Sequence, residues 1–120
     1  MMTKKSKFAL KKLINSYGFY VDIEISVEER EEGGILIDFG AYSSTEWKES
    51  INFGIDYFLA HHFILSEKNI KVKILDLKTM VVDTKKIVVV YATVMCLCDI
   101  FKTKIHGLEI DNLGRICFPK

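Results

Sequence analysis

The sequence predicts a two-layer α+β fold, with helices packed on one face of a mixed or antiparallel sheet and the element order α-β-β-α-β-α-β-β. Some segments alternate apolar and polar residues with the period of a strand, whereas others repeat apolar residues with the period of a helix. The stretch 87–101, IVVVYATVMCLCDIF, is the most apolar part of the chain and is expected at its centre. A length of 120 residues fits a single domain, 1–120, with its own core.

The N-terminal segment is predicted to form a helix over residues 5–17. Its apolar residues recur at helical spacing and would share one face. Gly18 follows as the predicted C-terminal cap, because glycine adopts the left-handed conformation without steric cost. The apolar face comprises Leu10, Leu13, Ile14 and Tyr17, and the lysines that crowd the other positions are Lys4, Lys5, Lys7, Lys11 and Lys12.

A β-hairpin with an acidic loop is predicted next. Residues 19–27 alternate strictly, which is typical of a strand with one buried and one solvated face. Residues 35–42 are the predicted return strand, and EEREEGG over residues 28–34 forms the loop. On the solvated face we expect Tyr20, Asp22, Glu24 and Ser26, together with Tyr42 from the return strand.

A helix is predicted from Ser43 to about residue 63, because Ser43 and Glu46 have the spacing of a capping box. Its apolar stripe contains Trp47, Ile51, Ile55, Phe58, Leu59 and His62. Residues 70–77 alternate again and are predicted to be a strand. The segments 105–111 and 115–118 are predicted to close the chain as a hairpin, with Leu108, Ile110, Ile116 and Phe118 facing inward.

The apolar run is interpreted as a buried helix over residues 84–101 that begins at Asp83 and Thr84. Fifteen residues would extend about 50 Å as one strand but about 22 Å as a helix, and a chain of this size has a radius of gyration of about 13–14 Å. The alternative is a strand over residues 86–95 followed by a helical turn, which the β-branched residues favour.

Composition gives no strong indication of function. The formal net charge is +1, which provides no overall attraction to nucleic acid or membrane. The apolar run is shorter than the roughly 20 residues that span a bilayer, so a cytoplasmic protein without a membrane partner is predicted. An odd number of cysteines, Cys96, Cys98 and Cys117, indicates reduced and buried thiols. The spacing fits no zinc motif. We therefore predict no metal, no cofactor and no catalytic residue.

Two adjacent histidines, His61 and His62, are the first candidates for chemistry. Neighbouring helical residues point about 100° apart, so this pair does not have the i, i+4 spacing that places two imidazoles on one ion. Packing near a helix end is the simpler interpretation. A small enzyme with a cleft near His61, His62 or the strand carboxylates Asp22, Glu24 and Asp38 stays an alternative.

Charge segregation is the clearest functional pattern. The leading prediction is a small non-enzymatic protein-binding domain, an adaptor or an immunity or antitoxin-type neutraliser of a basic toxin or nuclease. The predicted partner-binding residues are Tyr20, Asp22, Glu24, Glu28, Glu29, Glu31 and Glu32. The alternative is an RNA- or ribosome-binding domain that uses Lys4, Lys5, Lys7, Lys11 and Lys12. A homo-oligomer is a further alternative.

Two family resemblances accompany these patterns. GGILIDFGAY followed by a helix with histidines resembles the tunnelling fold of pterin synthases, which implies a zinc-binding histidine trio. No histidine precedes His61, so no residue role is transferred. The β-β-α-β-α order, with KVKILDLKTMVVDT before a helix, resembles the domain shared by ribosomal protein S5 and the translocating elongation factors. That resemblance implies the fold and is the basis for the RNA-binding alternative.

Overall fold

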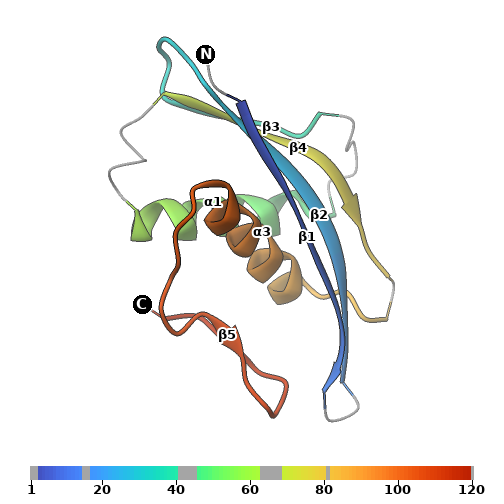
Figure 1. Cartoon of the computed structure of the whole chain (residues 1–120). Helices are drawn as coiled ribbons and strands as arrows, with labels where there is room; N and C mark the ends of the chain where they lie inside the picture. The colour runs from blue at the N-terminus through green and yellow to red at the C-terminus, as the bar shows by residue number, and fades with distance from the viewer. Residues whose placement is uncertain (1–2, 15–16, 41–45, 63–68, 81, 120) are drawn as a thin grey trace.

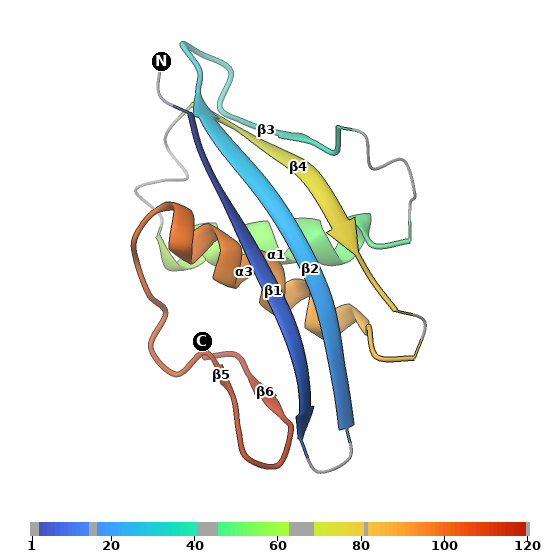
Figure 2. The same ribbon diagram turned by 45° about the vertical axis from the view of Figure 1, so that its right-hand side comes forward.

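The computed structural model describes residues 3–14, 17–40, 46–62, 69–80 and 82–119. Within these residues a four-stranded sheet carries two helices on one of its faces (Figures 1 and 2), so the predicted α+β class is confirmed. The elements are β1 (Thr3–Ile14), β2 (Tyr17–Glu29), β3 (Ile35–Asp38), α1 (Lys48–His61), β4 (Ile70–Lys78), α3 (Lys86–Ile100), β5 (Glu109–Ile110) and β6 (Ile116–Cys117).

The first element is a strand, so the helix predicted over residues 5–17 is wrong. β1 pairs antiparallel with β2 along its whole length, from Thr3 opposite Glu28 to Ile14 opposite Tyr17. The segment also alternates, since Phe8 and Leu10 face the core while Lys7 and Ala9 lie on the other side. Leu10 is 4% exposed. Pairing with β2 prevailed over the helical spacing of the apolar residues. Gly18 accordingly lies within β2 and caps no helix.

The two strands of the predicted hairpin are not neighbours. The sheet order is β1-β2-β4-β3, so β4 lies between β2 and β3. β4 pairs antiparallel with β2 and parallel with β3. The chain leaves β2, crosses the start of β4 and enters β3, and the amide of Arg30 donates to the Asn69 carbonyl at this crossing. α1 then provides the crossover that a parallel β3–β4 pair requires. The predicted strand over residues 70–77 is confirmed as β4.

α1 confirms the predicted helix but not its start. Ser43 lies outside the described residues. The helix has Trp47 as its N-cap, and no side chain caps it. Its buried residues include Ile51, Ile55 and Phe58, which belong to the predicted apolar stripe. α1 therefore packs this stripe against α3.

α3 confirms the interpretation of the apolar run as a helix, and the alternative strand is wrong. The helix contacts β1, β2, α1 and β6, so nearly every side of it is buried and apolar side chains are favoured around its circumference. The cap predicted at Asp83 and Thr84 is wrong, because Lys85 is the N-cap and no side chain caps it. Thr84 Oγ1 instead donates to the Tyr20 carbonyl and accepts from the Met80 amide, which ties the β4–α3 loop to β2.

The core lies between the sheet and α3. Alternate residues of β2 and β4 point into it and are at most 6% exposed: Val21, Ile23, Ile25, Val27, Ile70, Val72 and Ile74. The predicted C-terminal hairpin is confirmed, and its paired strands β5 and β6 are two residues long each. The predicted inward residues Leu108, Ile110, Ile116 and Phe118 are half-buried against this core.

Candidate functional site

Some of the predicted acids and lysines share the outer face of the sheet, which is the face turned away from α1 and α3. They are Asp22, Glu24, Glu28, Lys5, Lys7 and Lys11. Antiparallel register places Lys7 opposite Glu24 and Lys11 opposite Tyr20. Since directly opposed residues project to the same side of a sheet, acids and lysines alternate across this face. The outer face is therefore a mixed surface of both charges.

Cross-strand contacts neutralise much of this charge. Lys7 Nζ lies 3.5 Å from the carboxylate of Asp22, which is 6% exposed. Lys71 lies 3.7 Å from Glu28 and 3.5 Å from Asp38. The amide of Gly40 donates to Asp38 and, together with the neighbouring lysines, keeps the pKa of Asp38 below its usual value.

Tyr20 is also engaged within the sheet. It is half-buried, and the ammonium of Lys11 lies 5.6 Å from the centroid of its ring. The predicted companion Tyr42 lies outside the described residues. Lysines of β1 therefore cover the middle of the predicted acidic surface, Lys7 by its ion pair with Asp22 and Lys11 by its contact with Tyr20.

The unneutralised acids lie where the chain leaves β2. Glu29, Glu31 and Glu32 are exposed, and none of them forms an ion pair with a described residue. Arg30 between them donates to the carbonyl of Gly34 at 3.2 Å, so its charge is used within the turn. We call Glu29, Glu31 and Glu32 the acidic end.

The predicted basic helix is replaced by a basic edge strand. Lysines of β1 are divided between its two faces: Lys5, Lys7 and Lys11 lie on the outer face, whereas Lys4 and Lys12 lie opposite the inward residues Val27 and Phe19. All five are exposed. The prediction of one basic surface therefore changes to a basic edge.

Neither histidine lies near the strand carboxylates, because α1 and the outer face are on opposite sides of the sheet. His61 Nδ1 is 2.9 Å from the Tyr57 carbonyl, and its ring packs 4.3 Å from that of Tyr57. The ring of His62 lies 4.7 Å from that of Phe58. The Nε2 atoms of both are buried without a hydrogen-bond partner among the described residues. Both imidazoles thus form part of the packing at the end of α1.

The two cysteines of α3 are packing residues. Cys96 is 0% exposed and Cys98 is 5% exposed. Burial raises the pKa of Cys96 to about 12 and that of Cys98 to about 11, which keeps both as thiols at neutral pH. Among the described residues, no group of three or more potential metal ligands is assembled. No helix in the described ranges is long and apolar enough to cross a bilayer.

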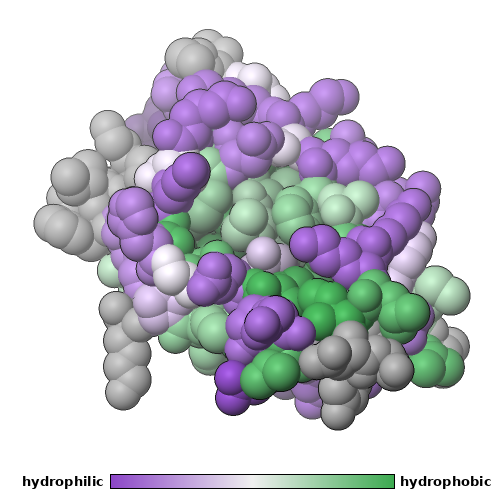
Figure 3. All heavy atoms as spheres, turned by 60° about the horizontal axis from the view of Figure 1, so that its bottom comes forward, coloured by the Kyte–Doolittle hydropathy of each residue, from purple (hydrophilic) through white to green (hydrophobic). Residues whose placement is uncertain are grey.

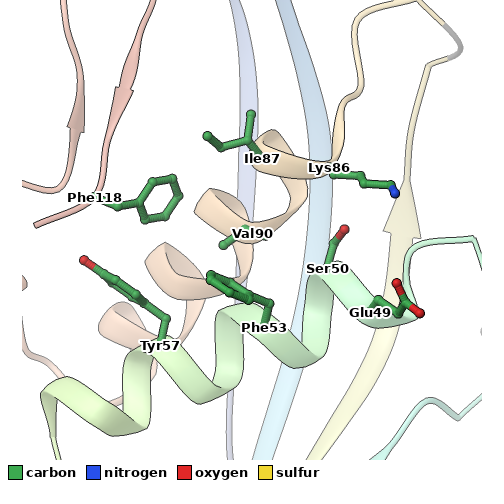
Figure 4. Close-up of a pocket in the computed structure, with 8 residues that line it drawn as sticks. All are labelled: Glu49, Ser50, Phe53, Tyr57, Lys86, Ile87, Val90 and Phe118. Carbon is green, nitrogen blue, oxygen red and sulfur yellow. The ribbon is translucent and has the colours of Figure 1, made fainter. Parts of the chain in front are cut away.

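An apolar groove lies between the two helices, and sequence reasoning missed it. It has a volume of about 470 Å³ and opens between α1, α3 and the C-terminal segment (Figure 4). We call it the helix groove. Phe53, which is 61% exposed, forms one wall, and Phe118 lies across from it. The full lining is Glu49, Ser50, Phe53, Tyr57, Lys86, Ile87, Val90 and Phe118.

The C-terminal segment is fastened across this groove by polar contacts. The hydroxyl of Tyr57 donates to the Pro119 carbonyl, and the rings of Tyr57 and Phe118 meet edge-to-face at 5.4 Å. Desolvation raises the pKa of Tyr57, so the phenol stays a hydrogen-bond donor. The wall formed by Phe118 is thereby held in place.

A second pocket adjoins the helix groove at Ile87. It has a volume of about 680 Å³ and lies between the start of β2, the β4–α3 loop and the turn of the β5–β6 hairpin. We call it the end pocket. Three exposed apolar side chains line it: Val82 (78% exposed), Ile87 (47%) and Leu113 (52%). Figure 3 shows hydrophobic residues gathered on this face of the molecule, framed by hydrophilic ones.

The turn that carries Leu113 is preorganised. Asp111 accepts from the amides of Leu113 and Arg115 and from Arg115 Nε, each at 2.9 Å. These bonds lower the pKa of Asp111. The apolar wall of the end pocket is therefore held by a hydrogen-bonded acid.

The sequence contained a signal for the groove. Phe53 lies among polar residues on the face of α1 opposite the predicted stripe, and Ile87 is the first residue of the apolar run. A single exposed apolar residue is normal, whereas a contiguous exposed apolar patch marks an interaction site, so Phe53 and Ile87 become informative only once the fold brings them together.

Comparisons with known proteins show the fold alone. No family model matches the chain, and no curated protein matches it. Among solved structures, a protein from Thermus thermophilus is similar, with a TM-score of 0.69 at 15% identity over 85% of this chain. A homoserine kinase from Cytophaga hutchinsonii is similar with a TM-score of 0.53 at 18% identity over 88% of this chain. The chain corresponds to 16% and 37% of those two proteins.

Proposed function

We propose that the chain is a protein-binding domain that holds an apolar, acid-flanked helix of its partner in the helix groove. The observation that carries this proposal is the exposure of Phe53 and Ile87 on the walls of an apolar concavity of about 470 Å³. Exposed apolar side chains that gather around a groove are typical of interaction surfaces.

A helix is the occupant that suits the shape of this surface. The groove runs between two helices and continues into the end pocket at Ile87, so it offers two successive apolar depressions. An amphipathic helix presents apolar side chains one turn apart, which would fill two such depressions with successive anchors.

Charge at the rim favours acids on the partner. Lys85 and Lys86 are both exposed at the start of α3 and form no ion pair with a described residue. The first turn of α3 contains no acid, and the positive end of the helix dipole favours a nearby negative charge. Glu49 lies at the α1 side of the same groove, so the acid of the partner is expected on the α3 side.

The test uses two helical peptides with one apolar stripe and either acidic or basic flanks, titrated by fluorescence anisotropy. The acidic peptide should bind more tightly, and NMR shifts should map its contacts to Phe53, Ile87 and Phe118. Covering the exposed 61% of Phe53 removes roughly 120 Å² from water, worth up to about 3 kcal/mol. Phe53→Ala should therefore weaken binding about 30-fold after the costs of association.

A matched control is Leu36→Ala, which removes an exposed apolar side chain from the outer face of the sheet. Leu36→Ala should leave the affinity unchanged. Equal losses for Leu36→Ala and Phe53→Ala would refute the helix groove as the docking site. Failure of both peptides to bind at about 1 mM, where only the weakest complexes still form, would refute it as well.

The acidic end provides a second candidate, the neutralisation of a basic partner. It is favoured by the exposure of Glu29, Glu31 and Glu32 without ion pairs among the described residues. A lysine dodecapeptide should bind in low salt and lose affinity when all three residues become lysine. Asp56→Lys, an exposed change on α1, is the control. Equal binding by both variants would contradict this candidate.

A further inference from the structure

The free edge of β1 is a second surface, distinct from the helix groove. β1 is the first strand in the order β1-β2-β4-β3, so one of its edges has no strand beside it among the described residues. Its backbone-to-backbone hydrogen bonds go to β2, and no other described element exchanges such a bond with it. α3 contacts the main chain of β1 through Cys96 Sγ, which donates to the Ser6 carbonyl at 3.3 Å. In a strand paired on one side, about half of the residues direct their N–H and C=O groups to the open side.

The lysines on this edge disfavour pairing with the β1 strand of a second copy of the chain. Residues 3–14 contain five lysines and no acid. If the β1 strands of two copies paired with each other, lysines would oppose lysines, and like charges in cross-strand positions are destabilising. This arrangement protects the edge from self-association. The same lysines attract a strand that brings carboxylates to the positions opposite them.

The faces of β1 specify more than charge. Lys5, Lys7 and Lys11 lie on the outer face, so an added strand should place acids there at alternate positions. On the inner face, Phe8 is half-buried and its ring meets that of Tyr91 edge-to-face at 6.0 Å. An apolar residue of the added strand opposite Phe8 would extend this layer.

We propose that β1 binds an extended acidic segment of another protein as a fifth strand, acidic on its outer face and apolar opposite Phe8 and Leu10. The pairing combines main-chain hydrogen bonds along the free edge with ion pairs to the lysines. The mode is strand addition, in which the main chain supplies affinity and alternate side chains supply specificity. It does not depend on the helix groove, which lies on the opposite side of the helices from the sheet.

The experiment uses the full chain and three fluorescent twelve-residue peptides. The first has glutamates at alternate positions and two central valines on the other face. The second is identical but N-methylated at the amides that would face β1, and the third has lysines in place of the glutamates. The first peptide should bind, whereas the other two should bind at least about tenfold more weakly, because one lacks main-chain donors and the other carries like charge.

Hydrogen exchange supplies the second readout. Amides of β1 that face the open edge should gain protection when the acidic peptide binds, since they acquire carbonyl partners. Lys5→Glu combined with Lys11→Glu should weaken binding by about tenfold or more. Lys78→Glu combined with Lys102→Glu makes the same change in net charge on exposed residues outside β1 and the helix groove and should have little effect. Circular dichroism establishes that both variants are folded.

Each of three results would overturn the proposal. Equal binding of the N-methylated peptide would show attraction by charge alone. Unchanged exchange in β1 on saturation would show that no strand is added. Tighter binding of a single-stranded RNA dodecamer that competes with the peptide would assign the lysines to nucleic acid instead.

Discussion

Replacing Gly54 with alanine tests how closely α1 and α3 approach each other. A Cβ atom at position 54 would lie 2.9 Å from Thr93 Cβ, 3.0 Å from Thr93 Cγ2 and 3.1 Å from the Val90 carbonyl oxygen. Thr93 cannot easily yield, because it is 0% exposed and its hydroxyl donates to the Val89 carbonyl at 2.8 Å. The two helices must therefore separate to admit the methyl group.

The magnitude follows from two opposing effects. Alanine is favoured over glycine in a helix by about 1 kcal/mol. Restoring carbon–carbon contacts of about 3.7 Å requires a displacement of roughly 0.8 Å, and a gap of that size forfeits a quarter to a half of each dispersion contact nearby. Overpacking of a core commonly costs about 1–3 kcal/mol. Because Thr93 and the Val90 carbonyl are both held within α3, we expect a net loss of about 1–2 kcal/mol in the free energy of unfolding.

Urea denaturation measures this loss, with the fluorescence of Trp47 and the circular dichroism signal as probes. Ala60→Gly, an exposed change near the end of the same helix, calibrates the propensity effect and should cost at most about 1 kcal/mol. In a Thr93→Gly background, Gly54→Ala should become neutral or stabilising, because both side-chain contacts are gone. A stabilised Gly54→Ala single variant would refute the close packing of the helices.

The remaining predictions concern cysteine reactivity, a buried ion pair and acid sensitivity. Burial raises the pKa of Cys96 to about 12, so Cys96 should resist iodoacetamide at pH 8 in the folded protein, whereas the half-buried Cys117 should react. Mass spectrometry measures the labelling, and equal labelling of both cysteines would contradict the burial of Cys96. Lys7→Met should destabilise the fold by about 1–2 kcal/mol in urea because it leaves the buried carboxylate of Asp22 without its cation, and an unchanged midpoint would show that the ion pair is unimportant. Hydrogen bonds lower the pKa of Asp111 in the folded protein below its usual value of 3.8. The stabilisation by the Asp111 carboxylate is therefore fully present above pH 3.8 and is lost as the pH falls through the lower pKa of the folded state. Asp111→Asn should abolish the acid-induced change in the exchange of the β5–β6 amides, and persistence of that change would place its origin elsewhere.

Sequence patterns predicted the helical layer and β4 well because their periodicity agreed with their final burial. α3 is nearly apolar around its circumference, and length arithmetic alone distinguished a helix from a strand. β1 was misassigned because Leu10, Leu13 and Ile14 have helical spacing, whereas the alternation of the strand leaves Leu13 75% exposed. The choice depended on β2, whose long open edge could accept a partner, and nothing local in residues 5–17 encodes that pairing.

The candidate sites were predicted less well for a different reason. The acids and lysines were recognised as separate patches, but in the sheet Lys7 reaches its diagonal neighbour Asp22 and Lys71 lies opposite Glu28, so much of each charge is internal to the sheet. The helix groove arises between segments distant in sequence. Phe53 and Phe118 come together only after α1, α3 and the C-terminal hairpin have packed.

The position of β4 between β2 and β3 has a consequence for synthesis of the chain. Until residue 78 has left the ribosome, β2 lacks its second neighbour and β3 has none, although residues 3–61 already contain three strands and a helix. The core faces of β2 also stay uncovered until α3 follows. A nascent chain halted after α1 would present an apolar two-stranded ribbon with open edges, the kind of surface that chaperones bind. Completion of this fold therefore depends on its later half, whatever local structure forms first.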